Sequence, residues 1–270
     1  MGGAVKKIVE FPIKVVSKAL SWIMPQPEIP EFGETDFDSF EQGILLNKQS
    51  NDASIPVIYG TRLVGGTRVF METSGTDNTY LYMAIVLGEG EINDITEIRI
   101  DDKAVTWASD LADNTAVEVG SGDSNFYKDS ASLIRVEPHF GSDSQTASSL
   151  LSTLSSWGTN HRLRGLAYLA LRFKWNQDVF SSIPKVQAKV QGKKVVTLAS
   201  DLSEQTASFS SNPAFCLLDY LRNERYGKGI ATANIDLQSF YDASQVAVTQ
   251  VAPYSGGSNI NIFDCNAVLD

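Results

Sequence analysis

Hydrophobic and polar residues repeat with a helical period at the start of the chain. Within residues 5–24 the polar positions recur at steps of three or four, at Lys7, Glu10, Lys14, Ser17, Lys18 and Ser21. This spacing predicts an amphipathic helix with one polar stripe. Pro12 lies inside it and is expected to kink the helix or to start a new one there.

Four roles can be considered for this N-terminal helix, and the sequence argues against the first two. A secretory signal needs an uninterrupted apolar stretch, which Lys14 and Lys18 break, and myristoylation of Gly2 needs Ser or Thr where Lys6 stands. A basic amphipathic helix can also bind an anionic membrane surface. The fourth role is docking onto a partner subunit or onto the rest of the chain, and we expect this one.

Proline and acidic residues follow the helix. Pro25, Pro27 and Pro30 predict an extended linker. Residues 31–41 then combine five acidic residues with Phe32, Phe37 and Phe40 and contain no basic residue. We interpret this stretch as a solvated acidic linker, with a short aromatic motif that lies on a neighbour as the alternative.

From Gly43 the period changes to that of β-structure. Runs of β-branched and aromatic residues predict strands near 55–60, 63–70, 80–87, 97–102, 166–175 and 186–192. The glycine pair Gly65–Gly66 predicts a hairpin turn, and Gly192 followed by two lysines predicts another turn. In the serine-rich stretch 142–156, Leu150, Leu151 and Leu154 keep helical spacing, which predicts a short helix inserted between strands.

A capped helix is predicted at 212–226. Asn212 can accept a hydrogen bond from the first turn, and Pro213 occupies the first helical position, where a missing N–H costs nothing. Asp219 and Arg222 are spaced to pair on the exposed side, and Gly227 is expected to end the helix in the left-handed conformation. The remaining apolar surface comes from Phe215, Leu217, Leu218, Leu221 and Tyr226. A second helix is predicted at about 237–244.

Composition narrows the function classes. A hydrophobic share of 43% with 20% charged residues is typical of a globular protein, and no run of 18 uncharged apolar residues is present. The net charge of −10 argues against binding of nucleic acid through counterion release. Two cysteines and two histidines leave little for a disulfide scaffold, a metal site or histidine catalysis.

Candidate chemical motifs are weak. The stretch from Gly60 to Thr67 has the glycine spacing of a phosphate loop, but Gly66 stands where a lysine must reach the phosphates. His139 and His161 have no ligand spacing around them, and Cys216 and Cys265 are interpreted as buried free thiols in a helix and a strand. Asp101 and Asp102, as neighbours on a strand, would face opposite ways. We therefore expect no cofactor, no metal and no catalytic site.

Several segments together resemble the hub portion of phage tail-tip proteins, the lambda-like tip attachment (host specificity) protein J family. The main match is the string from Asn212 through Pro213, Leu217, Leu218, Asp219 and Tyr220, followed by Arg225, Tyr226 and Gly227. Residues 55–60 with Gly60, Gly65 and Gly66 resemble the early strand and turn of the family. Further matching segments occur in the family's order at 80–92, 100–102, 183–184 and 192–195, so that the resemblance covers roughly residues 43–230.

The resemblance implies a structural role. Such proteins form a homotrimer at the distal end of the tail tube, with pairs of small β-barrels that present a pseudo-sixfold ring to a hexameric tube-like protein. Other tail-tip proteins, and the C-terminus of the tape-measure protein, are further implied partners. DNA would pass through this conduit without specific binding, which an acidic wall favours.

The expected class is therefore α+β and mainly β, as a small antiparallel β-barrel or sandwich with an inserted helix. We expect an N-terminal helix and linker at 1–30, a β-rich hub domain at 31–200, and a helical segment at 201–270 that leads into a second β domain. The expected function is that of a structural virion protein of a tail tip, not an enzyme. One alternative is a cell-wall hydrolase that uses Glu89, Glu91, Asp101 and Asp102. The other is a carbohydrate-binding module built on Trp107, Trp157 and Trp175.

Overall fold

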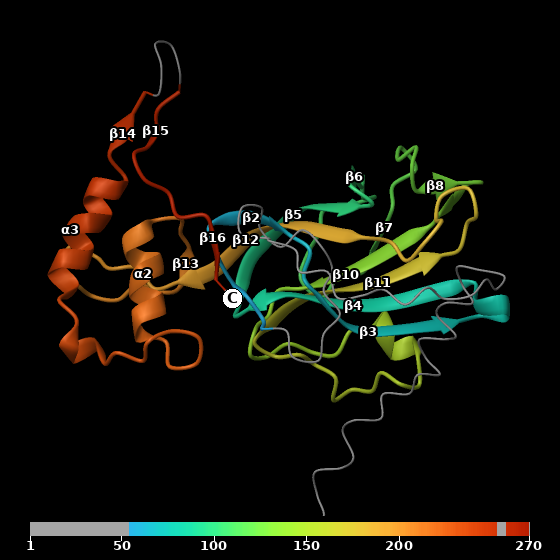
Figure 1. The fold of residues 1–270 in the computed structure, drawn as a ribbon, viewed down its shortest axis with the longest axis horizontal. Coiled ribbons are helices and arrows are strands. Elements are labelled where there is room, and N and C mark those ends of the chain that lie inside the picture. Colours follow the sequence, from blue (N-terminus) through green and yellow to red (C-terminus); the bar gives the residue numbers. More distant parts are fainter. Residues whose placement is uncertain (1–53, 253–257, 270) are drawn as a thin grey trace, which may run out of the picture.

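The computed structural model describes residues 54–252 and 258–269. Over these residues the chain is mostly antiparallel β-structure, with two α-helices at one end of the β-rich body (Figure 1). This confirms the predicted mainly β class. The expectations for residues 1–42, the amphipathic helix among them, lie outside the described residues.

The first sheet has five antiparallel strands in the order β3-β4-β11-β10-β7. Strands β4 and β11 carry long apolar runs because both of their faces are buried. In β4 the odd-numbered side chains from Leu81 to Leu87 enter the main core, and Tyr82, Ala84 and Val86 enter a second cluster behind the sheet. The strands are β3 (Thr67–Ser74), β4 (Tyr80–Glu89), β7 (Val117–Glu118), β10 (Ile134–His139) and β11 (Leu166–Lys174).

The second sheet has the order β13-β12-β5-β6, and β2 also pairs with β12. Its strands are β2 (Thr61–Val64), β5 (Ile92–Ile100), β6 (Lys103–Ala104), β12 (Val186–Val195) and β13 (Ser208–Phe209). The predicted turn at Gly192 is wrong, because β12 runs straight through it. A Cβ at Gly192 would lie 2.2 Å from the carbonyl oxygen of Ile58. The glycine therefore permits β1 (Val57–Tyr59) to approach the sheet closely.

The main core lies between the two sheets, whereas a second cluster lies on the outer face of the first sheet. The serine-rich stretch covers that outer face through Leu150, Leu151, Leu154 and Trp157. The predicted inserted α-helix is reduced to one 3-10 turn, η2 (Leu151–Thr153). The leucine spacing correctly predicted which residues are buried, but the backbone just before the turn is held by the carboxylate of Glu137 instead of by helical hydrogen bonds.

The predicted hairpin at Gly65–Gly66 is also wrong. The strands on either side, β2 and β3, belong to different sheets, so the chain turns a corner there. Gly66 has φ of +69°, and a Cβ on it would lie 2.5 Å from the carbonyl oxygen of Val86. Only glycine fits both the backbone conformation and the close approach to β4.

Asp101 and Asp102 lie in the two-residue turn between β5 and β6, not on a strand. Their φ angles are 50° and 63°, the left-handed values that a tight hairpin turn requires and that aspartate tolerates. Both residues are exposed. The short hairpin of β8 (Tyr127–Lys128) and β9 (Ala131–Ser132) and the 3-10 turn η1 (Thr76–Asn78) complete the β-rich body.

The C-terminal segment is helical and then returns to the body. It contains α2 (Pro213–Arg222), the 3-10 turn η3 (Thr232–Asn234), α3 (Leu237–Ala247), β14 (Gln250–Val251), β15 (Ile260–Asn261) and β16 (Ala267–Leu269). Strand β16 pairs antiparallel with β1, so that Val57 lies opposite Leu269. The predicted second helix is confirmed and continues to Ala247. The division at residues 30 and 200 stays a prediction.

Candidate functional site

The four acidic residues that a hydrolase would need do not meet. Glu89 and Glu91 lie just before β5, and Asp101 and Asp102 just after it. A nine-residue strand separates the two pairs by about 30 Å. Each carboxylate also has its own basic or backbone partner: Glu89 with Arg225, Glu91 with Lys194, Asp102 with Lys185 Nζ and Asp101 with the Lys185 N–H.

The three candidate tryptophans, all among the described residues, form no exposed platform for a sugar ring. Trp157 is buried in the second cluster, 5.0 Å from the ring of Phe70. Trp107 and Trp175 are half-buried and pack against the main core. These positions agree with tryptophans that pack in or against the core, and not with tryptophans that stack on a sugar.

The residues of the family-like string converge instead at one place, which we call the α2 junction: Tyr59, Asp219 and Tyr226 with the ion pair of Glu89 and Arg225. The carboxylate of Asp219 accepts hydrogen bonds from the Tyr59 hydroxyl at 2.5 Å and from the Tyr226 hydroxyl at 2.6 Å. Arg225 Nε lies 2.9 Å from Glu89 Oε1 at the end of β4. The junction therefore joins α2 and its following loop to β1 and β4.

Helix α2 begins as the sequence predicts. The Asn212 side chain accepts a hydrogen bond from the Ala214 N–H at 3.0 Å, and Pro213 is the first helical residue. The amide of Asn212 also donates to the carbonyl of Ser244 at 2.9 Å, which ties α2 to α3. Asn212 is thus both a helix cap and a link between the two helices.

The end of α2 differs from the prediction. The helix ends at Arg222, and Gly227 does not have the left-handed φ of a helix terminator. The following loop folds back over the helix instead, with the Lys228 N–H donating to the Tyr220 carbonyl at 3.1 Å. A Cβ at Gly227 would lie 1.8 Å from that same oxygen. Gly227 is therefore required by a close approach between two backbone segments.

The predicted pair of Asp219 and Arg222 does not form. Arg222 binds Glu204 at 2.6 Å, and Asp219 turns inward to the two tyrosines. Leu218 is buried as expected, but Leu217 is 50% exposed. The side chain of Tyr220 is half-buried, with Lys228 Nζ 5.9 Å from its ring centroid.

The predicted turn glycines separate. Gly60 lies at the α2 junction, with φ of +66°, and a Cβ there would lie 2.0 Å from the carbonyl oxygen of Cys265. Gly65 and Gly66 lie at the corner between the sheets. Sequence reasoning alone gave no sign that Gly60 and the C-terminal strand would be in contact.

The two tyrosine hydroxyls of the α2 junction have raised pKa values. Burial, and next the hydrogen bond to the Asp219 carboxylate, raise the pKa of both Tyr59 and Tyr226. Both hydroxyls therefore stay protonated and act as donors to Asp219. The junction is arranged to hold α2 in place, not to exchange protons near neutral pH.

The two free cysteines lie side by side. Cys216 is buried in α2, whereas Cys265 is half-buried in the loop before β16, so its predicted place on a strand is wrong. Their mutual hydrogen bond lowers the pKa of Cys265 to about 7, and the hydrogen bond and then burial raise the pKa of Cys216. The pair adds to the contact between α2 and the C-terminal strand.

Sequence reasoning missed a buried polar cluster behind the first sheet. Glu137 on β10 is 2% exposed and accepts hydrogen bonds from the Ser148 hydroxyl and the N–H groups of Ser149 and Leu150. His139 Nε2 lies 3.6 Å from this carboxylate, and its ring stacks on Tyr168 at 4.2 Å. The one available signal was an acidic residue two positions from a histidine on a short strand, Glu137 and His139 on β10.

Burial alone would raise the pKa of Glu137, but its neighbours outweigh burial. The His139 ring and the donors of Ser148, Leu150 and Ser149 lower the pKa to about 2. His161, the other histidine, is exposed and accepts from the Gly158 N–H through Nδ1. Glu137 therefore anchors the serine-rich stretch as a buried carboxylate.

A cleft of about 280 Å³ lies beside the α2 junction, lined by Val196, Leu218, Asp219, Arg222 and Asn223. Within the described residues no group of three or more His, Cys, Asp or Glu side chains is placed to hold a metal ion. No helix in that part of the chain is long and apolar enough to cross a membrane.

No protein-family model matches the chain. The chain is similar to the baseplate hub protein pb3 of Escherichia phage T5, with 25% identity over 231 residues that cover 71% of this chain. It spans about a quarter of that relative, 24% of its length. A chain from the virion of a native gene transfer agent particle superimposes with a TM-score of 0.41 at 17% identity, covering 67% of this chain and 35% of that one.

Proposed function

We propose that this chain is a structural protein of a phage tail and forms part of the hub at the distal end of the tail. The observation that carries the proposal is its similarity to a baseplate hub protein over 71% of its length. The mainly β fold with a helical end suits a structural subunit, because such a rigid body can pack against neighbouring proteins of the tail. Its location would be the virion.

The finer features of the proposal come from the resemblance to the lambda-like protein J hub. In this proposal three copies form a ring that continues the tail tube, and a hexameric tube-like protein and other tail-tip proteins are its neighbours. DNA passes through the ring during ejection without specific binding. The net charge of −10 supports this, because an acidic wall repels phosphate.

A non-enzymatic role is part of the same proposal. The carboxylates that could have hydrolysed a polymer lie at opposite ends of β5, where Glu89, Glu91 and Asp102 are in separate ion pairs and Asp101 accepts from a backbone N–H. A glycosidase needs two carboxyl groups within about 10 Å of each other across the scissile bond. The separation of these four carboxylates favours a structural role over hydrolysis of a polymer.

The decisive experiment locates the chain in particles. Particles of the phage that encodes the chain are purified and labelled with a gold-conjugated antibody against the chain. Quantitative mass spectrometry then gives the number of copies of the chain per particle. Label at the distal end of the tail with three copies per particle supports the proposal. Absence from purified particles, or degradation of purified cell wall by the isolated chain, would overturn it.

A further inference from the structure

Two arginines on one surface loop have no acidic partner. The loop before β11, residues 158–165, contains Arg162 and Arg164 and no Asp or Glu, and we call it the basic loop. Within the described residues neither arginine forms an ion pair, whereas Arg222 pairs with Glu204. Arg164 is exposed and Arg162 is half-buried. Both positive charges are therefore available to an anion.

Each guanidinium of the basic loop is anchored through one nitrogen. Arg162 Nε donates to the Thr159 carbonyl at 2.9 Å, and Arg164 Nε donates to the Gln145 carbonyl at 3.2 Å. In the part of the chain that the structure describes, the Nη groups of both side chains have no hydrogen-bond partner. A guanidinium carries five N–H donors, so each arginine keeps donors free for a carboxylate or a phosphate.

The backbone between the two arginines is held in an uncommon conformation. Leu163 has a φ of 47°, a left-handed value that is rare for a branched side chain. The buried amide of Gln145 maintains it by donating to the carbonyls of Arg162 at 2.8 Å and Leu163 at 2.9 Å. Strained backbone that its surroundings maintain is frequent at binding sites. The fold therefore fixes the backbone that carries the two arginines.

The start of the described chain lies beside the basic loop. Ile55 and Leu163 pack against the same hydrophobic cluster behind the first sheet. The Pro56 carbonyl accepts from the Glu89 N–H at 2.8 Å, and Glu89 lies opposite Leu166, the residue that follows the loop. The residues that precede Ile55 are therefore attached to the body close to the two arginines.

We propose that the acidic segment 31–41 of the same chain binds the two arginines of the basic loop. A carboxylate matches the fork of a guanidinium and can form two parallel charge-assisted hydrogen bonds with it. Residues 42–54 link the segment to Ile55, and this length of chain spans at most about 50 Å. The segment contains no basic residue and five acidic ones: Glu31, Glu34, Asp36, Asp38 and Glu41.

Charge density and the tether favour this segment over other anions. Five of its 11 residues are acidic, against 27 of the other 259 residues of the chain. A short flexible linker holds a tethered group at an effective concentration of about millimolar. A free anion, or an acidic side chain of another protein, has to compete with that local concentration. The bound segment would fix the side of the body on which residues 1–30 emerge.

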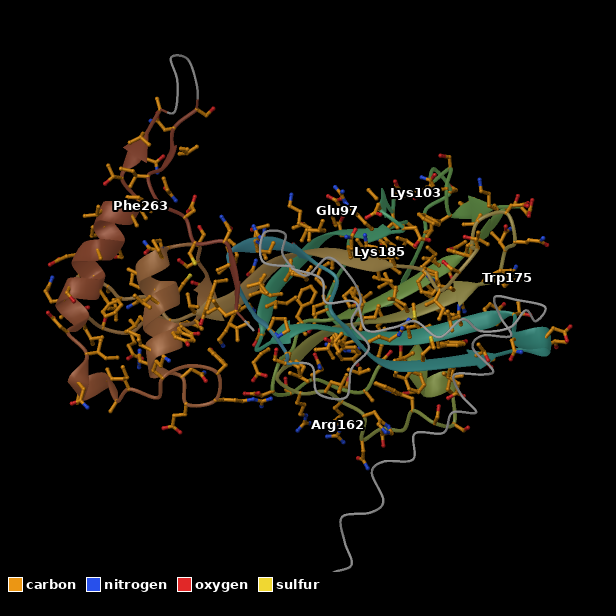
Figure 2. All side chains as sticks on the ribbon, viewed as in Figure 1. Glu97, Lys103, Arg162, Trp175, Lys185 and Phe263 are labelled. Carbon is orange, nitrogen blue, oxygen red and sulfur yellow. The ribbon has the colours of Figure 1, made fainter. Side chains whose placement is uncertain are left out.

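The first experiment couples amines to carboxylates with a carbodiimide in the full-length chain. Arg162→Lys/Arg164→Lys keeps both charges and supplies two amines in the basic loop. Mass spectrometry is expected to find these amines joined to residues 31–41. Lys103 is the internal control, because it is exposed and Figure 2 shows it on the opposite side of the body from Arg162. It is expected to give no link to the segment.

A mixture of unlabelled and isotope-labelled chains identifies the occupant. Links between two peptides of the same label only show that the segment belongs to the same chain. Links between differently labelled peptides show that a second copy supplies it, which would overturn the proposed contact within one chain.

The second experiment measures how fast chymotrypsin cleaves the segment after Phe37 and Phe40. Arg162→Glu/Arg164→Glu is expected to speed this cleavage roughly fivefold, because the segment loses two charge pairs and is repelled. About 0.5 M NaCl is expected to speed cleavage of the wild-type segment as well, since salt screens exposed charges.

Two further variants separate a local pairing from a general effect of charge. Lys103→Glu/Lys189→Glu changes the net charge by the same amount on two exposed lysines of the second sheet, and it is expected to leave the cleavage rate unchanged. Adding Asp36→Arg/Asp38→Arg to the reversed basic loop is expected to restore slow cleavage, because the signs then match again. Unchanged circular dichroism shows that the variants fold.

Links from the basic loop to residues 31–41 within one chain, with faster cleavage only in the loop variant, support the proposed contact. Equal links from Lys103, links from the loop to other carboxylates only, or equal cleavage of all variants would overturn it. The contact lies within one chain, so both measurements use the purified protein and their outcome does not depend on the proposed hub function.

Discussion

Asp219 shows how one residue can connect distant parts of this chain. Its carboxylate receives the hydroxyls of Tyr59 and Tyr226, and Tyr59 is 160 residues away in sequence. Hydrogen bonds to a charged group are stronger than those between neutral groups. The connection between α2 and β1 therefore depends strongly on this carboxylate.

Replacing Asp219 by Ala should lower the free energy of unfolding by roughly 2–4 kcal/mol, because two partly buried hydroxyls lose their acceptor. Tyr59→Phe should cost roughly 1–2 kcal/mol, since it removes one hydrogen bond to the carboxylate. Both values are measured by chemical denaturation. The exposed Glu224, on the loop after α2, provides the control Glu224→Ala, which should change stability by less than about 0.5 kcal/mol. An equal loss in both acidic variants would contradict the role of the α2 junction.

Glu137 makes stability depend on acid pH. Its pKa is about 2 in the folded protein and about 4.3 in an unfolded chain. Since the folded pKa is the lower one, the stabilisation is fully present above pH 4.3 and is lost as the pH falls toward 2. The difference corresponds to roughly 3 kcal/mol.

The variant Glu137→Gln should therefore unfold more easily at pH 7 and lose most of the added acid sensitivity between pH 4.3 and 2. Denaturation midpoints measured across this pH range check both effects. Glu118→Gln, on the half-exposed Glu118 of β7, is the control. Parallel pH profiles of wild type and Glu137→Gln would show that the carboxylate does not stabilise the fold.

Sequence spacing predicted the residues that cap helix α2 and many of the buried residues. It did not predict which residues from distant parts of the chain they contact. The cap by Asn212 and Pro213 was predictable because it involves neighbours in sequence. The spacing of Asp219 and Arg222 favoured a surface pair, yet both residues bind distant groups instead. Tertiary contacts outweighed a helix-surface pair that contributes only about 0.2–0.5 kcal/mol.

At the scale of elements, close backbone approaches explain several glycines. Gly227 lies where the loop after α2 passes over the helix, and the Cβ of any other residue would lie 1.8 Å from the Tyr220 oxygen. Gly227→Ala should lower the free energy of unfolding by roughly 2–4 kcal/mol, because the loop has to move off the helix. Thermal unfolding measures the change.

The matched control is Gly122→Ala. A Cβ at Gly122 meets no atom within 4 Å, so this substitution should be close to neutral. Equal effects of the two substitutions would mean that the loop is not constrained at Gly227.

Close approaches between backbone segments also limited how well strands and turns could be predicted from the sequence. Strands β4 and β11 were predictable from long apolar runs, because burial on both faces leaves no polar alternation. Gly192 and the pair Gly65–Gly66 look like turn residues in sequence, yet one lies inside a strand and the other at a corner between sheets. What distinguishes these cases is the neighbouring backbone, which the sequence does not identify.

At the scale of the whole molecule, the role of residues 1–24 stays a prediction. Their amphipathic pattern would expose an apolar stripe unless it is covered, and we expect a tail-tip neighbour or the tape-measure protein to cover it. Deleting residues 1–24 should prevent assembly of infectious particles while the circular dichroism of the β-rich body stays unchanged. Normal infectivity of the deletion would contradict this role.

A second variant separates the membrane alternative. Replacing Lys6, Lys7, Lys14 and Lys18 by Gln keeps the apolar stripe and removes the positive charge. Particle assembly should continue if the stripe docks on protein. Loss of binding to anionic vesicles together with loss of infectivity would support a membrane contact instead.

The pairing of β1 with β16 has a consequence for how the chain folds. Val57 and Leu269 meet only after nearly the whole described chain has been synthesised, and Tyr59 likewise waits for Asp219. Contacts of such long sequence separation form slowly, because closing the loop costs entropy before any contact forms. The α2 junction is therefore expected to form in a late, slow phase of refolding. During that phase newly made copies would have their two sheets in place while the helical end is still undocked.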